Sequence, residues 1–378
     1  MKKKITIMCL HTGMGGIENY VASLAKMLIP KYEVKIVSTY KVLNRNIFNF
    51  KDEIEIDYLI NDYPKKERFK QALKKKDIIR ILSTGFSLLK ILFLKYYKNI
   101  IAIKKSDADY IITTRDFHNK LVGKYRKKGV VTIATEHNYH NNDKKYIKKV
   151  VNSCRKIDYL VLVSKNLKDF YEKKLVNTKC IYIPNTIERI PKYKEKEKLS
   201  NKLISVGRLV EEKGFSDLID IIYLLKKRIP NIILDIYGDG ELKDSLYKKI
   251  KSKKLDKNIN LKGAIFHDEL LEIMKEYDLY LMSSYTESFG LVILEAFSNS
   301  VPVVAFDSAD GALNLLKNER GVLIKNRNKE DYANAVYNLL NDMKKMNQIS
   351  KNGYDSLKKY TMDNVRKKWE ELLDNSDY

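Results

Sequence analysis

Short runs of β-branched and aliphatic residues alternate with longer stretches in which apolar residues recur every three or four positions. The short runs predict strands and the longer stretches predict amphipathic helices. The predicted strands cover residues 5–10, 34–38, 110–113, 130–135 and 159–164, and then 203–206, 232–237, 259–261, 279–282 and 302–305. Strands that alternate with helices are typical of parallel βαβ units. We therefore predict an α/β protein with two Rossmann-like, doubly wound domains that face a cleft and bind ligands at the carboxyl ends of their strands.

The alternation stops over residues 188–200, a charged segment that contains a proline and lacks apolar periodicity. Such a segment is typical of a domain linker. We therefore predict a first domain over residues 1–187 and a second domain over residues 201–353. Residues 354–378 include an amphipathic stretch with the only tryptophan, Trp369, and are predicted to form a helix.

The chain has 378 residues, of which 44% are hydrophobic, and this composition excludes a disordered chain or a small disulfide scaffold. The three cysteines form no C-x-x-C pair, which indicates a reducing compartment. The apolar run at the N-terminus is too short for a signal peptide. Within residues 78–101 the longest uncharged run has 9 residues, against the ~20 that a spanning helix needs. We expect a cytoplasmic protein, with a peripheral place on the inner face of the cell membrane as a further option.

The positive charge is concentrated in the first half of the chain. Residues 1–184 hold 39 Lys and Arg against 17 Asp and Glu, whereas residues 185–378 hold 33 against 31. Residues 65–128 alone hold 19 against 5, with aromatic and aliphatic residues interleaved between positions 86 and 97. A helix of this kind can lie in an anionic membrane interface. The alternatives are an ordinary amphipathic helix packed on the first domain and a general bias towards lysine.

The most informative motif follows the predicted strand at 279–282. The free amides of Gly290, Leu291 and Val292 in a first helical turn make an anion site, and a glycine there lets the backbone approach a phosphate closely. Glu287 precedes that helix and Glu295 lies within it, so two carboxylates flank the anion site. This arrangement is typical of a site for a hydroxyl-rich ligand that carries a diphosphate. The alternative, a surface helix on which the two glutamates are only solvated, is less favoured.

A second motif follows the strand at 203–206. Gly207 ends the strand, and Arg208 and Lys213 lie in the loop before the next helix. A planar guanidinium and a compact ammonium can together neutralise a diphosphate without a metal, although both could also be solvated loop cations. The glycines Gly238 and Gly240 indicate another strand-to-helix turn, which by itself is only weak evidence for a binding site.

The first predicted strand is followed by a turn that contains Gly13, Gly15 and Gly16, with amides available to an anion. The turn lacks the G-x-G-x-x-G spacing and a Walker lysine, which disfavours a nicotinamide or ATP site. Glu18 follows in the first helical turn, where it either stabilises the helix dipole or contacts substrate.

The strand at 130–135 is followed by His137, Asn138 and His140. His137 is placed to hydrogen-bond a polar ligand, and His140 fits a structural role better. The two histidines lack a third ligand, so we predict no metal site.

Together these residues resemble the family 4 retaining glycosyltransferases, which have the GT-B fold. The motifs that carry the resemblance are Gly15-Gly16-Ile17-Glu18, Pro184-Asn185, Gly207-Arg208-Leu209 with Lys213-Gly214, Gly238-Asp239-Gly240, and the segment from Glu287 to Glu295. The resemblance spans nearly the whole chain, and the spacing of the two glutamates is its most specific part. The chain departs from the family pattern at Thr186, where a glycine is usual, and in the loop Asp310-Gly311-Ala312, which has one glycine where the family often has two.

The resemblance implies a role for each motif residue. Arg208 and Lys213 would hold the diphosphate, Glu287 the donor sugar, Glu295 the ribose, and His137 would lie beside the reacting sugar. The catalytic residues would be Glu287, His137, Arg208 and Lys213. The donor-binding residues would be Gly15, Gly16, Gly207, Gly238, Phe289, Gly290, Leu291, Val292 and Glu295. Glu18 and Asn138 would lie on the acceptor side, and the terminal helix would return to the first domain.

The implied activity is a metal-independent, retaining transfer of a hexose or N-acetylhexosamine from a nucleotide-diphosphate sugar, preferably a UDP-sugar. The implied acceptor is a lipid-linked or cell-surface glycan in the synthesis of polysaccharide, capsule or lipopolysaccharide, and no cofactor is needed beyond the donor. A sugar-nucleotide epimerase of the same fold is the alternative. A nucleic-acid-binding protein would explain the charge, but no reader motif is present.

Overall fold

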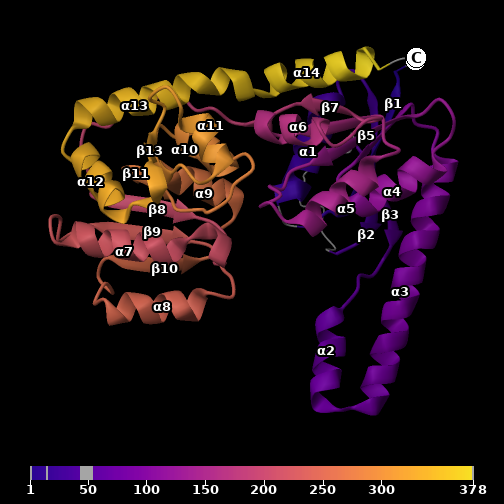
Figure 1. Ribbon diagram of the computed structural model, residues 1–378, viewed down its shortest axis with the longest axis horizontal. Helices are drawn as coiled ribbons and strands as arrows, with labels where there is room; N and C mark the ends of the chain where they lie inside the picture. The colour runs from indigo at the N-terminus through magenta and orange to yellow at the C-terminus, as the bar shows by residue number, and fades with distance from the viewer. Residues whose placement is uncertain (1, 14–15, 43–53, 377–378) are drawn as a thin grey trace. The chain divides into compact units, whose positions relative to one another are not determined.

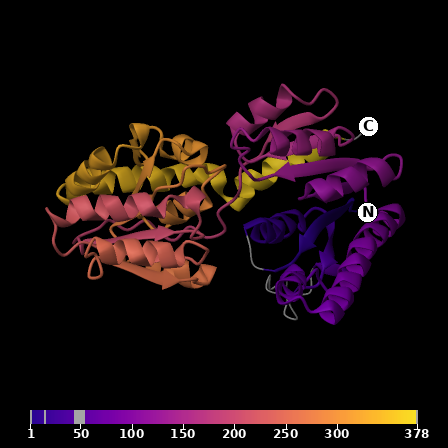
Figure 2. The same cartoon turned by 60° about the horizontal axis from the view of Figure 1, so that its bottom comes forward.

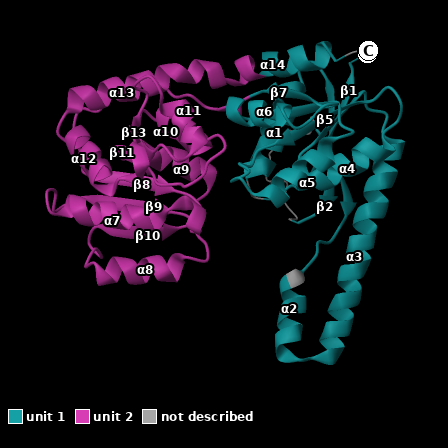
Figure 3. Ribbon diagram, in the orientation of Figure 1, with its two compact units in different colours: residues 1–183, 366–378 teal, residues 184–365 magenta. Residues whose placement is uncertain are grey.

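The computed structural model describes residues 2–13, 16–42 and 54–376 (Figure 1). The chain forms two compact units (Figure 3). Unit 1 comprises Met1–Ile183 with Arg366–Tyr378, and unit 2 comprises Pro184–Val365. Each unit is built around one parallel sheet with helices packed on it (Figures 1 and 2).

The sheet of unit 1 has seven parallel strands in the order β3-β2-β1-β4-β5-β6-β7. The strands are β1 (Lys4–His11), β2 (Glu33–Tyr40), β3 (Glu55–Ile60), β4 (Tyr110–Thr113), β5 (Val131–Glu136), β6 (Tyr159–Leu162) and β7 (Lys179–Tyr182). The helices are α1 (Gly16–Leu28), α2 (Lys66–Lys75), α3 (Ile78–Lys105), α4 (Asp116–Tyr125), α5 (Lys144–Cys154) and α6 (Lys165–Glu172). Side-chain caps fix several helix starts: Asp143 accepts from the amides of Lys145 and Tyr146, and Ser164 from that of Leu167.

The sheet of unit 2 has six parallel strands in the order β10-β9-β8-β11-β12-β13. The strands are β8 (Lys202–Val206), β9 (Ile233–Tyr237), β10 (Ile259–Gly263), β11 (Leu279–Met282), β12 (Val303–Phe306) and β13 (Val322–Ile324). The helices are α7 (Phe215–Lys226), α8 (Lys243–Ser252), α9 (His267–Met274), α10 (Leu291–Ser298), α11 (Asp310–Leu316), α12 (Lys329–Leu340) and α13 (Met343–Ser356), with 3₁₀ turns η1 (Glu211–Lys213), η2 (Lys325–Arg327) and η3 (Leu357–Tyr360). Aliphatic side chains from β8, β9, β11, α7 and α12 form one core.

All ten predicted strands are present, and three further strands, β3, β7 and β13, lie at sheet edges. The prediction of two doubly wound α/β domains is therefore confirmed for each unit taken by itself. Two details differ from the expectation. Residues 188–200 belong to unit 2, because the backbone amide of Lys196 donates to Asn347 and that of Ser200 donates to Asp278.

The predicted terminal helix is also not continuous. α13 ends at Ser356, η3 follows, and Thr361 has extended backbone geometry before α14 (Met362–Asp374) begins. The last part of α14 belongs to unit 1. There the Tyr110 hydroxyl donates to the carbonyl of Leu373, and Lys31 pairs with Asp374 at 2.7 Å.

α2 and α3 form an antiparallel hairpin that extends away from the sheet of unit 1 (Figure 1). α3 has 28 residues. Among the described residues, neither α3 nor any other helix has an apolar stretch of the length that a membrane span needs.

Candidate functional site

Three loops of unit 2 emerge at one edge of its sheet. β9, β8 and β11 are neighbouring parallel strands, so their carboxyl ends lie side by side. The loops that follow these strands begin at Gly238, Gly207 and Ser283. The fold therefore brings together the three motifs that the sequence analysis singled out in the second half of the chain.

Gly238 allows two of these loops to approach each other closely. Its φ is +144°, and a Cβ atom at this position would lie 1.8 Å from the carbonyl oxygen of Gly207. No side chain fits at that distance. The amide of Gly207 also donates to the carbonyl of Tyr237, so the β8 loop is fixed against the end of β9.

Lys213 and Glu287 meet at the centre of the site. Lys213 Nζ lies 2.8 Å from Glu287 Oε2, and both side chains are about three-quarters buried. Two further hydrogen bonds join the loops: the Ser283 hydroxyl donates to the carbonyl of Lys213, and the amide of Tyr285 donates to the carbonyl of Glu212. The cation and the carboxylate predicted to bind diphosphate and sugar are thus held as a pair.

Arg208 lies in the same loop but points into solvent. Its side chain is 74% exposed and makes a long, 4.0 Å ion-pair contact with Glu212. An exposed guanidinium at the mouth of the site can turn towards an anionic ligand without losing a buried contact.

α10 begins directly after Gly290, which has a φ of +91° and serves as the N-cap. The amides of the first turn, at Leu291 and Val292, have no partner within the helix and face the N-terminal end, where anions are favoured. Phe289 is buried and its ring lies 5.8 Å from that of Tyr360. A ligand at this site can therefore reach the backbone of Phe289 but not its side chain.

Glu295 is buried in α10 and contacts a residue that the sequence analysis did not single out. Its Oε1 atom lies 2.9 Å from Nε2 of His267, the first residue of α9. The hydrogen bond to Glu295 raises the pKa of His267 above its usual value, although partial burial opposes the rise. The second carboxylate oxygen retains capacity to accept from a hydroxyl group.

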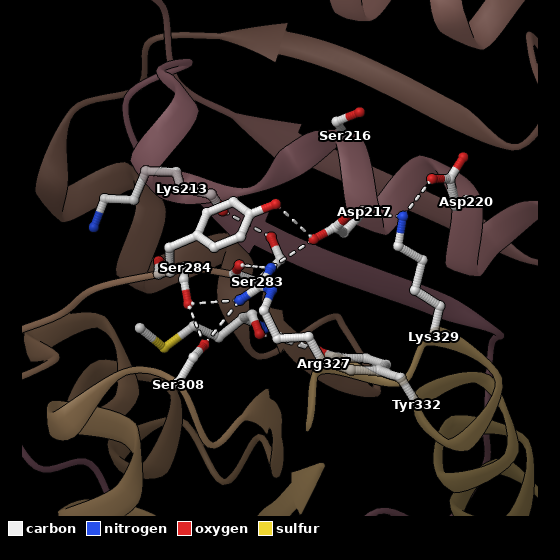
Figure 4. A network of polar contacts seen from close by, with 12 residues as sticks. Lys213, Ser216, Asp217, Asp220, Ser283, Ser284, Ser308, Arg327, Lys329 and Tyr332 are labelled. Carbon is white, nitrogen blue, oxygen red and sulfur yellow. Dashed lines mark hydrogen bonds and ion pairs between the residues drawn. The ribbon is translucent and has the colours of Figure 1, made fainter. Parts of the chain in front are cut away.

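Arg327 supports the loop that carries Glu287 (Figure 4). Its Nη2 atom donates to the carbonyl of Ser283 at 2.8 Å and to Asp217 at 2.6 Å, and its Nη1 atom donates to the carbonyl of Ser284 at 3.2 Å. The guanidinium also stacks on Tyr285, with its Cζ atom 3.7 Å from the ring centre. One side chain thus fixes two consecutive carbonyl groups just ahead of Glu287.

Asp217 and Asp220 on α7 continue this network (Figure 4). Lys329 lies 2.7 Å from a carboxylate oxygen of each. Burial alone would raise the pKa of Asp220, but Lys329 and Lys249 outweigh it and lower that pKa to about 2. The pKa of Asp217 is lowered in the same way by Lys329 and Arg327. Both carboxylates are therefore ionised at neutral pH.

In unit 1 a second group of polar side chains gathers at the carboxyl edge of the sheet. Glu18 is 5% exposed, and its Oε1 atom lies 3.4 Å from Arg115 Nη2 and 3.5 Å from His11 Nδ1. Arg115 follows β4 and His11 ends β1, so the central strands supply both partners. Glu18 is held by a guanidinium and lies beside an imidazole, so it does more than complement a helix dipole.

His137 follows β5 and lies beside α1. Its ring centre is 4.0 Å from that of Tyr20. Burial lowers the pKa of His137 to about 3, and the nearby Arg115 adds to this effect, so the imidazole is neutral at physiological pH. The amides of His137 and Asn138 both donate to Glu136. His140 stacks on Phe170, with ring centres 3.9 Å apart.

The structure therefore assembles the predicted residues into one group in each unit. Unit 2 holds Gly207, Arg208, Lys213, Gly238, Glu287, Phe289, Gly290, Leu291, Val292 and Glu295. Unit 1 holds Gly16, where α1 begins, with Glu18, His137 and Asn138, whereas Gly15 lies outside the described residues. The sequence analysis missed Arg115, His267 and Arg327. Within the described ranges, no group of three or more His, Cys, Asp or Glu is arranged to hold a metal ion.

Two parallel-sheet units, with glycine-rich loops at the carboxyl edge of the second sheet, define the GT-B class of α/β proteins. The comparison with solved structures agrees. TarM of Staphylococcus aureus, crystallised as a point mutant in complex with fondaparinux, α-GlcNAc-glycerol and UDP, superimposes with a TM-score of 0.77 and 16% identity over 98% of this chain and 99% of that chain.

Most of the second unit matches a family model. Residues 186–356 match the model of the family described as glycosyl transferases group 1. The poly(ribitol-phosphate) α-N-acetylglucosaminyltransferase of S. aureus is 26% identical over 66% of this chain and 51% of its own length. The poly(glycerol-phosphate) α-glucosyltransferase of Bacillus subtilis is 29% identical over 72% and 38%.

The chain covers only part of the curated relatives. It spans between 38% and 51% of the length of the first four curated proteins that it matches.

Proposed function

We propose that the protein transfers a hexose or N-acetylhexosamine from a UDP-sugar to a glycan or polyol-phosphate acceptor, with retention of the anomeric configuration. The observation that carries the proposal is the Lys213–Glu287 pair beside the start of α10. A lysine ammonium has three donors, so Lys213 can bond Glu287 and a phosphate oxygen together. The second oxygen of Glu287 can then accept from a hydroxyl of the donor sugar.

The remaining residues suit the other parts of a nucleotide sugar. Arg208 and the first amides of α10 supply positive charge for the diphosphate, and Glu295 supplies an acceptor for the ribose hydroxyls. Because the imidazole of His137 is neutral, it is better suited to a hydrogen bond with a sugar hydroxyl than to an ionic contact with the diphosphate. Glu18 and Asn138 are proposed to lie on the acceptor side.

The proposed reaction needs no metal. The acceptor oxygen bonds to the anomeric carbon, the bond from that carbon to the diphosphate oxygen breaks, and the acceptor proton passes to the departing oxygen on the same face. Negative charge grows on the diphosphate as it leaves. Fixed cations and helix amides therefore stabilise the transition state more than the ground state.

The acceptor is proposed from the relatives. Their names describe transfer of sugars to poly(ribitol phosphate) and poly(glycerol phosphate). We extend this to a cell-surface or lipid-linked polymer that the protein meets at the cytoplasmic face of the membrane. Sugar-nucleotide epimerisation is the second candidate, because the same site would hold the same donor.

A donor screen separates the two candidates. The protein is incubated with UDP- and GDP-linked hexoses and N-acetylhexosamines, with and without poly(ribitol phosphate) or poly(glycerol phosphate), in EDTA. We expect free UDP and a glycosylated polymer from one UDP-sugar. Conversion of a UDP-sugar to its epimer without acceptor would contradict the proposal, as would a strict requirement for a divalent metal.

A further inference from the structure

The hairpin of residues 65–105 carries a surface that glycosyl transfer does not explain. Its long helix, α3, is anchored in unit 1 from its midpoint onwards, where Ile91, Asn99 and Ile103 are buried. Asn99 accepts a hydrogen bond from Thr39 at the end of β2. The N-terminal half of α3 packs against α2 and otherwise projects beyond the sheet (Figure 1).

One face of α3 is both apolar and exposed. The residues of this apolar stripe are Ile79, Leu82, Phe86, Leu89, Phe93, Tyr96 and Tyr97. From Ile79 to Phe93 they follow one another at intervals of three or four positions, and Tyr96 and Tyr97 lie three and four positions after Phe93, so all seven line one side of the helix. Their exposed fractions run from 53% to 81%. A row of large apolar side chains this long is rare on the free surface of a soluble protein.

α2 does not cover the stripe. It packs against another side of α3, where a Cβ atom added to Gly85 would lie 3.3 Å from the Phe69 ring. At the far end of the stripe the Tyr96 ring lies 5.0 Å from that of Phe117 on α4. All seven side chains nevertheless remain more than half exposed in the folded unit.

Polar and basic residues border the stripe. Arg80, Ser83, Ser87 and Lys90 are exposed and also follow one another at intervals of three or four, which places them along one flank. The whole hairpin holds 13 Lys and Arg against two Asp and Glu, a net charge of +11 in 41 residues. An apolar face with cations beside it is the pattern of a helix that lies in a membrane interface.

We propose that the α2–α3 hairpin docks on an anionic bilayer, with the apolar stripe at the acyl boundary and the lysines and arginines among the headgroups. Charge complementarity decides the occupant. A second copy of the chain would bring two hairpins of +11 together, whereas anionic lipid supplies the opposite charge. The inference goes beyond the proposed transferase activity and stands without it.

Vesicle flotation of the full chain tests this proposal. We expect the protein to float with vesicles of phosphatidylglycerol and phosphatidylcholine and to stay behind with phosphatidylcholine alone. Raising the salt to ~1 M, where the Debye length falls to ~3 Å, should release it. Equal flotation with both kinds of vesicle, or none with either, would overturn the proposal.

A double variant, Phe86→Asp with Phe93→Asp, places charges in the stripe without touching the core, because both side chains are exposed. We expect ~tenfold less protein on anionic vesicles and an unchanged unfolding temperature. The matched control is Val176→Asp, at a position of unit 1 that is 97% exposed outside the hairpin, and it should float like the wild type. A dimer in sedimentation equilibrium that the double variant dissociates, without flotation of the wild type, would show instead that a second copy covers the stripe.

Discussion

The chemistry of the candidate site depends on a few side chains whose partners lie far away in the sequence. Lys213 and Glu287 are separated by 74 positions, and His267 and Glu295 by 28. The sequence predicted Lys213, Glu287 and Glu295 because they belong to motifs with fixed spacing. It did not predict Arg115, His267 or Arg327, because each stands outside any motif and gains its role only from the fold.

The two glutamates of the site provide a first prediction. Changing Glu287 or Glu295 to Gln keeps the size of the side chain but removes the charge that accepts from hydroxyl groups. Turnover with the donor should fall by at least ~tenfold, equivalent to ~1.4 kcal/mol, while the unfolding temperature changes little. The exposed Glu269→Gln variant of α9 serves as the control and should retain full turnover. Wild-type turnover in both site variants would remove these residues from the site.

Arg208 provides a second prediction. Because its side chain is exposed, Arg208→Ala should leave the free energy of unfolding unchanged. It should weaken UDP binding by ~1.5–3 kcal/mol, the usual contribution of a hydrogen bond to a charged group. Titration calorimetry with UDP measures the loss, and an unaltered dissociation constant would show that Arg208 does not touch the diphosphate.

At the level of elements, the interior strands were easier to predict than the edges. β4, β6, β11 and β12 are buried at all four positions and appear in the sequence as continuous apolar runs. The missed strands β3, β7 and β13 lie at sheet edges, where several positions are only half-buried. Their mixed sequences lack that signal.

Arg327 connects 3₁₀ turn η2 to the loop after β11, and the connection can be tested. Arg327→Lys replaces a planar fork by one ammonium group, which cannot bond Asp217 and two carbonyl groups in the same geometry. We expect a higher KM for the donor and some loss of stability. Asp220→Asn is the control, because Asp220 contacts Lys249 and Lys329 and not the carbonyl groups of Ser283 and Ser284. This variant should lower stability and leave the KM for the donor unchanged. Equal donor KM values in both variants and the wild type would refute a positioning role for Arg327.

The same network predicts a dependence of stability on pH. The folded pKa of Asp220 is lowered to about 2, against about 3.9 for an unfolded aspartate. A lowered folded pKa stabilises the protein above the unfolded pKa, and this stabilisation is lost as the pH falls through the folded pKa. The advantage of the wild type over Asp220→Asn should be ~2 kcal/mol at pH 5 and shrink towards zero near pH 2. Urea unfolding at several pH values measures it, and a constant difference would contradict the assignment.

At the level of the whole molecule, the sequence predicted two doubly wound units but not where the chain passes between them. The charged segment at 188–200 resembles a linker, yet its backbone is bonded to unit 2 and the division falls at residue 184. The extended residue Thr361, which separates α13 from α14, carries no strong helix-breaking signal such as proline. Contacts between distant segments decide both features, and a local pattern cannot report them.

The central claim is that the loops at the carboxyl edge of the second sheet hold the diphosphate and ribose of a sugar nucleotide. A crystal structure of the protein with UDP tests it most directly. The account predicts that the diphosphate contacts Arg208, Lys213 and the amides at the start of α10, and that the ribose hydroxyls reach Glu295. UDP bound away from these residues, or contacts to none of them, would contradict it.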